Sequence, residues 1–155
     1  MPTIKAFRMD GLGNKFVIVD RRKDIVNITK EKIIHLGNLE SFHREIGFDQ
    51  IIFIEREIDK AFPITIFNSD GGEVSACGNG SRCVAYLLGK DLNTKEVKLK
   101  TNNRLLNAKI VGDLDVELAM GKPIFEWNKI PLSKNLDHSN ITLNIEDKVF
   151  TDGFC

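Results

Sequence analysis

Residues 83–88, with the sequence CVAYLL, carry no charged side chain and directly follow the small-residue stretch ACGNGSR. This pattern predicts an α-helix over residues 78–88, with Gly89 as its terminating glycine. Past its first turn the helix has almost no polar face, and a helix that is apolar all round is enclosed by other elements. The rest of the chain therefore has to wrap around it.

The flanking segments are typical of strands that could do this wrapping. Alternating and β-branched runs predict strands at 4–9, 16–20, 49–56, 62–68, 96–101, 104–111 and 114–120. Residues 27–47 predict one helix or two short ones, with Thr29 as N-cap. Turns such as GLGN, NN and GD join several strands as hairpins. We expect an α+β fold, a mostly antiparallel sheet wrapped around the central helix and without a βαβ repeat.

Composition excludes several classes of function. Lys and Arg number 22 and Asp and Glu number 22, so there is no overall basic field for nucleic acid. No apolar run is long enough to span a membrane, and residues 1–16 lack the apolar core of a secretory signal, so we expect a cytoplasmic protein. The three Cys form no framework or C-x-x-C and the three His are scattered, so neither disulfides nor a zinc site is expected.

Cys77 is the residue whose position most suggests chemistry. If the helix begins at Gly78, the thiol lies at the N-cap, where unpaired backbone N–H groups and the helix dipole favour a thiolate and can also bind a carboxylate. Glycines at 78 and 80 would let a ligand approach the backbone closely. The alternative is that Cys77 is a small buried filler. Cys83 lies within the apolar helix and is expected in the core, whereas the pattern around Cys155 predicts nothing.

Four neutral amides stand at predicted turns or strand ends: Asn14, Gln50, Asn68 and Asn79. Each by itself is explained by turn chemistry, because Asn caps and tolerates left-handed backbone. Together with the thiol they suggest a polar pocket for a zwitterion, since amides bind both ammonium and carboxylate groups without adding net charge.

Several motifs occur in an order that resembles the diaminopimelate epimerases: FRMDGLGNKF, GFDQ, NSDGGE, ACGNGSRCVA and MGKP. The resemblance covers essentially the whole chain from residue 4 and is densest at 68–86. It implies two similar halves, each a sheet around a central helix, with the substrate in the cleft between them. One cysteine from each half would face opposite sides of the substrate α-carbon, one as base and one as acid. No cofactor or metal is implied.

Carried over by motif, the resemblance makes Cys77 the first catalytic cysteine. Gly78 and Asn79 would hold the substrate α-carboxylate. The other substrate-binding amides of this half would be Asn14, Gln50 and Asn68. The implied reaction interconverts LL- and meso-diaminopimelate, so the expected partner is this small molecule, with a homodimer or a complementing C-terminal half as the expected protein partner.

The chain departs from the family pattern in three ways. It has Asp10 and Lys15 where the family usually has His and Asp, and the loop before GFDQ is shorter than usual. The family is also much longer than 155 residues. We expect residues 1–120 to form the N-terminal domain and residues 121–155 a truncated beginning of the second, so the chain lacks the second catalytic cysteine and is inactive alone. Residues 124–155 are expected to be disordered or paired with another chain.

Three other interpretations remain at this point. The chain could be another cofactor-independent amino-acid racemase, such as a proline racemase, although that type typically has His at the position of Asn79. It could be a non-catalytic binding remnant of the same fold. A cysteine hydrolase is disfavoured, because nothing in the sequence ties His35, His43 or His138 to Cys77.

Overall fold

In the computed structural model the chain forms two compact units, Met1–Met120 and Gly121–Cys155. Residues 5–41, 44–45 and 47–153 are described; Cys155 and parts of the predicted segments 4–9 and 27–47 lie outside them. Among the described residues, no helix has the length and apolar character needed to cross a bilayer.

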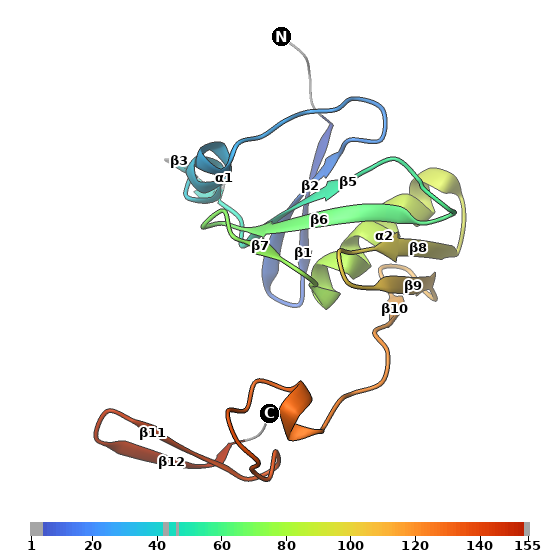
Figure 1. The fold of residues 1–155 in the computed structure, drawn as a ribbon. Helices are drawn as coiled ribbons and strands as arrows, with labels where there is room; N and C mark the ends of the chain where they lie inside the picture. The colour runs from blue at the N-terminus through green and yellow to red at the C-terminus, as the bar shows by residue number, and fades with distance from the viewer. Residues whose placement is uncertain (1–4, 42–43, 46, 154–155) are drawn as a thin grey trace. The chain divides into compact units, whose positions relative to one another are not determined.

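The first unit is built on one curled sheet around a long helix (Figure 1). Its described residues include the α-helices α1 (Lys30–Gly37) and α2 (Gly78–Leu92). In spatial order the strands are β1 (Ala6–Gly11), β2 (Asn14–Asp20), β5 (Gln50–Ile54), β6 (Phe62–Asn68), β8 (Glu96–Lys100), β9 (Leu105–Ile110) and β10 (Val116–Ala119), and the short β7 (Glu73–Val74) pairs with β6. The predicted α+β class and the sheet wrapped around a central helix are confirmed.

The sheet is mixed and contains parallel pairs joined through helices, which corrects the expectation of a sheet without a βαβ repeat. Most neighbouring strands are antiparallel, but β2 runs parallel to β5 and β6 runs parallel to β8. Parallel neighbours cannot be joined by a tight turn and need a long crossover. Here α1 lies in the connection from β2 to β5, and α2 lies in the connection from β6 to β8.

Alternation along the strands separates two hydrophobic cores, one on each face of the sheet. Phe16, Ile18 and Ile52 belong to the core that also contains Val84 and Leu88 of α2. The side chains between them in sequence point the other way. Among them, Val19, Ile51 and Phe53 form the second core with Ile33 of α1 and with Phe48, and Val17, Ile28 and Phe67 pack beside it. Every second residue of a strand in this region therefore faces α2.

The first predicted helix is much shorter than the pattern suggested. Thr29 is its N-cap as expected, with Oγ1 accepting a hydrogen bond from the Lys32 N–H at 3.4 Å. It ends at Gly37 and is followed by two short paired strands, β3 (Glu40–Ser41) and β4 (Arg44–Glu45). A Cβ on Gly37 would lie 2.8 Å from the Ser69 Cβ, so the end of α1 packs directly against the turn after β6.

The second helix begins at the predicted residue, Gly78. The prediction of Gly89 as its terminating glycine is wrong, because the helix continues past it. It ends at Leu92, and Asn93 caps it in the left-handed conformation at φ 51°. Gly89 is instead a close-packing position, because a Cβ there would lie 2.7 Å from Ile110 Cδ1 and 2.9 Å from the Thr94 carbonyl oxygen. The last turn, from Lys90 onward, is exposed, so only the earlier turns of the helix are enclosed.

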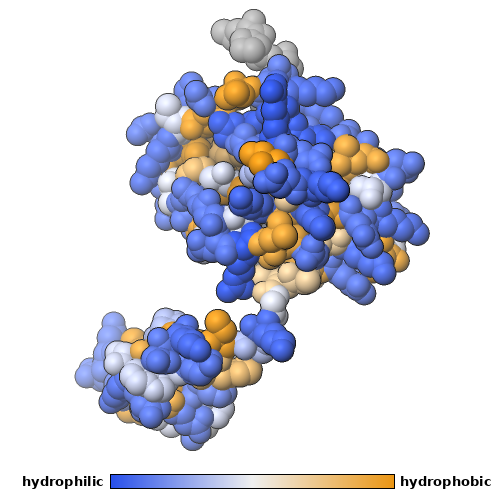
Figure 2. Space-filling view, turned by 45° about the vertical axis from the view of Figure 1, so that its right-hand side comes forward, coloured by the Kyte–Doolittle hydropathy of each residue, from blue (hydrophilic) through white to orange (hydrophobic). Residues whose placement is uncertain are grey.

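The second unit contains regular structure within its described residues. A short 3₁₀ helix (Trp127–Lys129) precedes a hairpin of β11 (Ile141–Ile145) and β12 (Lys148–Gly153). The expectation of disorder over residues 124–155 is not met at Ile141–Ile145 and Lys148–Gly153, and the alternative, pairing with another chain, stays a prediction. Large apolar side chains are nevertheless exposed in this unit: Ile124, Phe125, Leu143, Ile145, Val149 and Phe150. Figure 2 shows hydrophobic patches scattered over a mostly hydrophilic surface.

Candidate functional site

Three of the predicted amides lie at one end of three neighbouring strands and on one face of the sheet. Gln50 begins β5 and pairs directly with Asn68, the last residue of β6. Phe16 of β2 pairs with Gln50 from the other side, and Asn14 begins β2 two residues earlier. By the alternation of the strands, Asn14, Gln50 and Asn68 continue the rows of side chains that face α2.

The N-terminus of α2 is at this same end of the sheet. Cys77 is the N-cap, with extended backbone, and its Sγ accepts a hydrogen bond from the Gly80 N–H at 3.3 Å. Its carbonyl oxygen accepts the first helical hydrogen bond, from the Ser81 N–H at 2.9 Å. The predicted placement of the thiol at the helix start is confirmed. Because the N–H groups of Gly78 and Asn79 precede that first bond, the helix itself offers them no acceptor.

Gly80 lets the helix start approach the sheet this closely. A Cβ at this position would lie 2.6 Å from Ile52 Cδ1, 3.2 Å from Phe16 Cε1 and 3.5 Å from Cys77 Sγ. Ile52 and Phe16 are fully buried, so they cannot move aside without disturbing the core. The glycine therefore brings Cys77 beside the strands that carry Asn14 and Gln50.

The four amide side chains form two hydrogen-bonded pairs. Gln50 Nε2 donates to Asn68 Oδ1 at 2.9 Å, and Asn79 Nδ2 donates to Asn14 Oδ1 at 3.0 Å. In both pairs the acceptor uses its oxygen, so the other end of Asn14 and of Asn68 is an NH₂ donor. Gln50 Oε1 is buried and has no hydrogen-bond partner among the described residues. The site thus combines donors suited to an anion with an unused acceptor suited to a cation.

The other described cysteine has a different environment. Cys83 belongs to α2 and is buried in the core between this helix and the sheet. A Cβ on Gly11 would lie 3.1 Å from the Cys83 Sγ. Burial raises the pKa of the Cys83 thiol, because a thiolate there would lose its solvation. The prediction of Cys83 as a core residue is confirmed. Cys77 is partly exposed, as a reacting thiol has to be.

The two residues that differ from the usual family motif, Asp10 and Lys15, face each other. They are direct partners across the β1–β2 hairpin, so an opposite-charge pair occupies the two strands next to the turn that leads to Asn14. The Lys15 N–H also donates to Asp49 Oδ2 at 2.7 Å, which joins the start of β2 to the start of β5. The turn itself is tight, with Gly13 at φ 89°.

Two residues that the sequence analysis did not single out lie against the helix start. Arg82 donates through Nη2 to Asn79 Oδ1. The sulfur of Met120 would be 3.0 Å from a Cβ on Gly78. The signal for Arg82 is present in the sequence, because residues three apart on a helix are neighbours. The contact of Met120 depends on tertiary structure alone.

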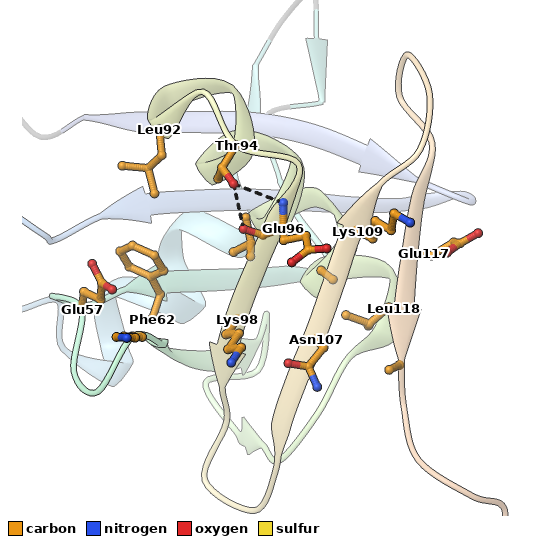
Figure 3. A pocket seen from close by; sticks show the side chains of 14 residues that line it. Glu57, Phe62, Leu92, Thr94, Glu96, Lys98, Asn107, Lys109, Glu117 and Leu118 are labelled. Carbon is orange, nitrogen blue, oxygen red and sulfur yellow. Dashed lines mark hydrogen bonds between the residues drawn. The ribbon is translucent and has the colours of Figure 1, made fainter.

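A cavity lies elsewhere on the sheet. About 880 Å³ in volume, it is formed mainly along β8, β9 and β10, and none of the six predicted site residues lines it (Figure 3). Five polar residues of its lining alternate with buried or half-buried residues along the strands, which is typical of a solvated sheet face: Glu96, Lys98, Asn107, Lys109 and Glu117. Within the described ranges, no group of three or more His, Cys, Asp or Glu is arranged to hold a metal ion.

The match to a known protein family covers the site residues described above. The family described as diaminopimelate epimerase matches residues 6–126. The diaminopimelate epimerase of Pelagibacter ubique (strain HTCC1062) is 46% identical over 145 residues, which are 94% of this chain and 52% of the relative. That of Acidiphilium cryptum (strain JF-5) is 38% identical over 136 residues, 88% of this chain and 48% of the relative. The chain spans about half the length of the curated relatives it matches.

Solved structures show the same fold at low identity. A phenazine biosynthesis PhzC/PhzF protein from Clostridium difficile (strain 630) has a TM-score of 0.55 and 18% identity, covering 71% of this chain and 41% of that protein. A predicted epimerase from Pseudomonas aeruginosa has a TM-score of 0.52 and 17% identity, covering 71% and 40%. At this identity the likeness concerns the fold of the chain and nothing finer.

Proposed function

The chain belongs to the diaminopimelate epimerase family, and from this we propose that it carries one half of an active site that interconverts LL- and meso-diaminopimelate. In this proposal residues 1–120 are the N-terminal domain and residues 121–155 begin the second domain. The small-molecule substrate binds at the end of the sheet where α2 begins. No cofactor takes part.

The observation that carries the proposal is the thiol of Cys77 at a helix N-terminus, next to strand ends that bear three amides. In the reaction the Cys77 thiolate removes the α-proton of the substrate and becomes a thiol, leaving a carbanion that is stabilised through the adjacent carboxylate. The N–H groups of Gly78 and Asn79 bind that carboxylate. Their fixed positions and the helix dipole favour the charge that develops on it.

The amides hold the remaining polar groups of the substrate. The NH₂ groups of Asn14 and Asn68 donate to carboxylate oxygen. Gln50 Oε1, which is buried in the free chain, accepts from an ammonium group once the Gln50 side chain turns toward the substrate. An amide oxygen that is buried without a hydrogen-bond partner destabilises the folded chain, and a bound ammonium group would remove this destabilisation. This gives the pocket a reason to prefer an amino acid over a simple carboxylic acid.

Inversion requires a proton donor on the opposite face of the α-carbon. Cys83 does not supply it, because it is buried in the hydrophobic core. We therefore propose that the second acid is the thiol implied by the family resemblance, on a part of the full-length enzyme that these residues do not include. The chain alone then binds substrate without inverting it.

Deuterium exchange tests this proposal. The chain is incubated with LL-diaminopimelate in deuterium oxide, alone and mixed with a separately produced chain that covers the remaining length of a relative. We expect deuterium at the α-carbon together with meso product in the mixture. Replacing Cys77→Ser should abolish both, whereas the matched core variant Cys83→Ala should retain them. Exchange that survives Cys77→Ser would refute the assigned role, and no exchange in any mixture would favour a non-catalytic binding protein.

A further inference from the structure

Arg82 lies one turn into α2, on the same side of the helix as Asn79. Its Nη2 donates to Asn79 Oδ1, and its Nη1 would lie 3.9 Å from a Cβ on Gly78. The guanidinium is therefore beside the turn that the proposed function assigns to the substrate carboxylate. It does not contact Cys77 in any described hydrogen bond.

A guanidinium has only donors, and this decides which way the Asn79 amide points. The atom that faces Arg82 has to be the oxygen, so Nδ2 is turned toward Asn14, to which it donates at 3.0 Å. The Asn14 oxygen is then occupied as an acceptor, and its NH₂ group is the end left to face a ligand. Two amides are oriented in series by one donor-only cation.

Without Arg82 the arrangement has an alternative of similar geometry. An amide that is rotated by 180° exchanges its oxygen and nitrogen with almost no change of shape. If Asn79 turned, its oxygen would face Asn14, and Asn14 would have to present its NH₂ to Asn79 and its oxygen to the ligand. The pocket would then offer an acceptor where an anion needs a donor.

We propose that Arg82 is a positioning residue, which sets the amide of Asn79 and through it the amide of Asn14 so that both present donors to the carboxylate of a bound amino acid. The orientation of the amides follows from the free protein alone. Its consequence for a ligand rests on the proposed function.

The Gln50–Asn68 pair provides an internal contrast. It is joined by a similar amide-to-amide hydrogen bond of 2.9 Å, but no described hydrogen bond links it to an arginine. Changes at Arg82 should therefore alter the Asn14–Asn79 pair and leave the Gln50–Asn68 pair as it is. A general loosening of the fold would affect both pairs.

The test uses the whole chain in four forms: wild type, Arg82→Met, Arg82→Lys and Arg82→Glu. Side-chain ¹⁵N relaxation of the four amides reports their order without any ligand. We expect Asn79 and Asn14 to be as rigid as the backbone, with order parameters of about 0.85, in the wild type and in Arg82→Lys, which keeps a donor-only cation. Both should fall below about 0.6 in Arg82→Met, while Gln50 and Asn68 stay unchanged.

The second measurement is protection of Cys77 from iodoacetamide by diaminopimelate. We expect the half-protecting concentration to rise by about tenfold or more in Arg82→Met and further in Arg82→Glu, whose carboxylate accepts hydrogen bonds and would turn Asn79 around. Arg82→Lys should stay within about threefold of the wild type. The exposed variant Arg56→Met, which also removes one positive charge, should match the wild type.

The two measurements separate the inference from the proposed function. If diaminopimelate does not protect the wild type, the proposed function fails, and the relaxation data still decide the role of Arg82. Equal order in wild type and Arg82→Met, or equal loss of protection in Arg82→Lys and Arg82→Met, would overturn the positioning role. Circular dichroism identifies a variant that has not folded. In that case wild type and Arg82→Lys are compared in both measurements, amide order and protection of Cys77.

Discussion

Arg22 joins the end of β2 to the last turn of α2, and its replacement by Met removes this connection while keeping an apolar stem. Its Nε and Nη2 donate to the two carboxylate oxygens of Asp20 at 2.9 and 2.8 Å, and Nη2 also donates to Asp91 at 2.7 Å. The side chains of Arg22 and Asp20 are 17% and 11% exposed, whereas that of Asp91 is 45% exposed. The two contacts should therefore differ in strength.

The Asp20 contact carries most of the expected loss. A charge-assisted hydrogen bond is worth about 1.5–3 kcal/mol, and Arg22→Met also leaves the largely buried Asp20 carboxylate without this partner. We expect the free energy of unfolding to fall by about 2–3 kcal/mol at pH 7. Asp91→Asn should cost less than about 1 kcal/mol, because solvent screens an exposed ion pair.

The effect should depend on pH in a definite direction. Hydrogen bonds from Arg22 hold the pKa of Asp20 below its ordinary value, so the ionised pair is favoured in the folded state. A lowered folded pKa contributes stability that is complete above the unfolded value, near pH 4, and is lost as the pH falls through the lower folded value. The difference between wild type and Arg22→Met should therefore shrink below pH 4.

Urea unfolding at pH 7 and pH 3, followed by far-ultraviolet circular dichroism, measures this difference. The exposed variant Lys98→Met, on the outer face of β8, is the matched control for loss of one charge and should be close to neutral. A loss for Arg22→Met below about 0.5 kcal/mol at pH 7 would refute the reasoning. So would a loss of the same size at pH 3.

Three further predictions concern α2. Leu88→Ala removes a side chain that is 1% exposed in the core and should lower the free energy of unfolding by about 2–5 kcal/mol in the same urea assay; a loss under about 1 kcal/mol would contradict the packing. Gly89→Ala should destabilise by about 1–3 kcal/mol although Ala favours helices, since its Cβ would clash with the Thr94 carbonyl oxygen at 2.9 Å; a stabilised variant would show that the helix end can shift. Cys83 should react with iodoacetamide far more slowly than Cys77 at pH 7.5 and should gain reactivity only at higher pH, because burial raises the pKa of its thiol. Peptide mass spectrometry measures both rates, and equal rates would contradict the burial of Cys83.

Features set by local interactions could be predicted from the sequence. The N-cap at Cys77, the N-cap at Thr29 and the core position of Cys83 all depend on residues within a few positions of one another. Positions at predicted turns and strand ends group Asn14, Gln50 and Asn68, and the family resemblance then implies their role as substrate-binding amides. The structure brings all three to the end of the sheet where α2 begins. Their roles toward a substrate stay predictions.

Other features are decided by contacts between segments that are distant in sequence. Hairpin turns are visible in the sequence, but nothing local shows that β2 pairs in parallel with β5, because that pairing follows from how α1 packs on the sheet. Gly89 looks like a helix terminator until β9 and Thr94 are placed beside it. The Asn79–Asn14 hydrogen bond likewise joins residues 65 positions apart.

The sequence by itself therefore determined that a thiol begins a buried helix and that a sheet surrounds it, since capping and hydrophobic periodicity act over a few residues. Only the tertiary structure decided which side chains lie against the start of that helix. The register of three strands puts the amides on the α2 face, because a shift by one residue would turn each of them to the opposite face. The absence of a side chain at Gly80 then allows the helix start to reach them.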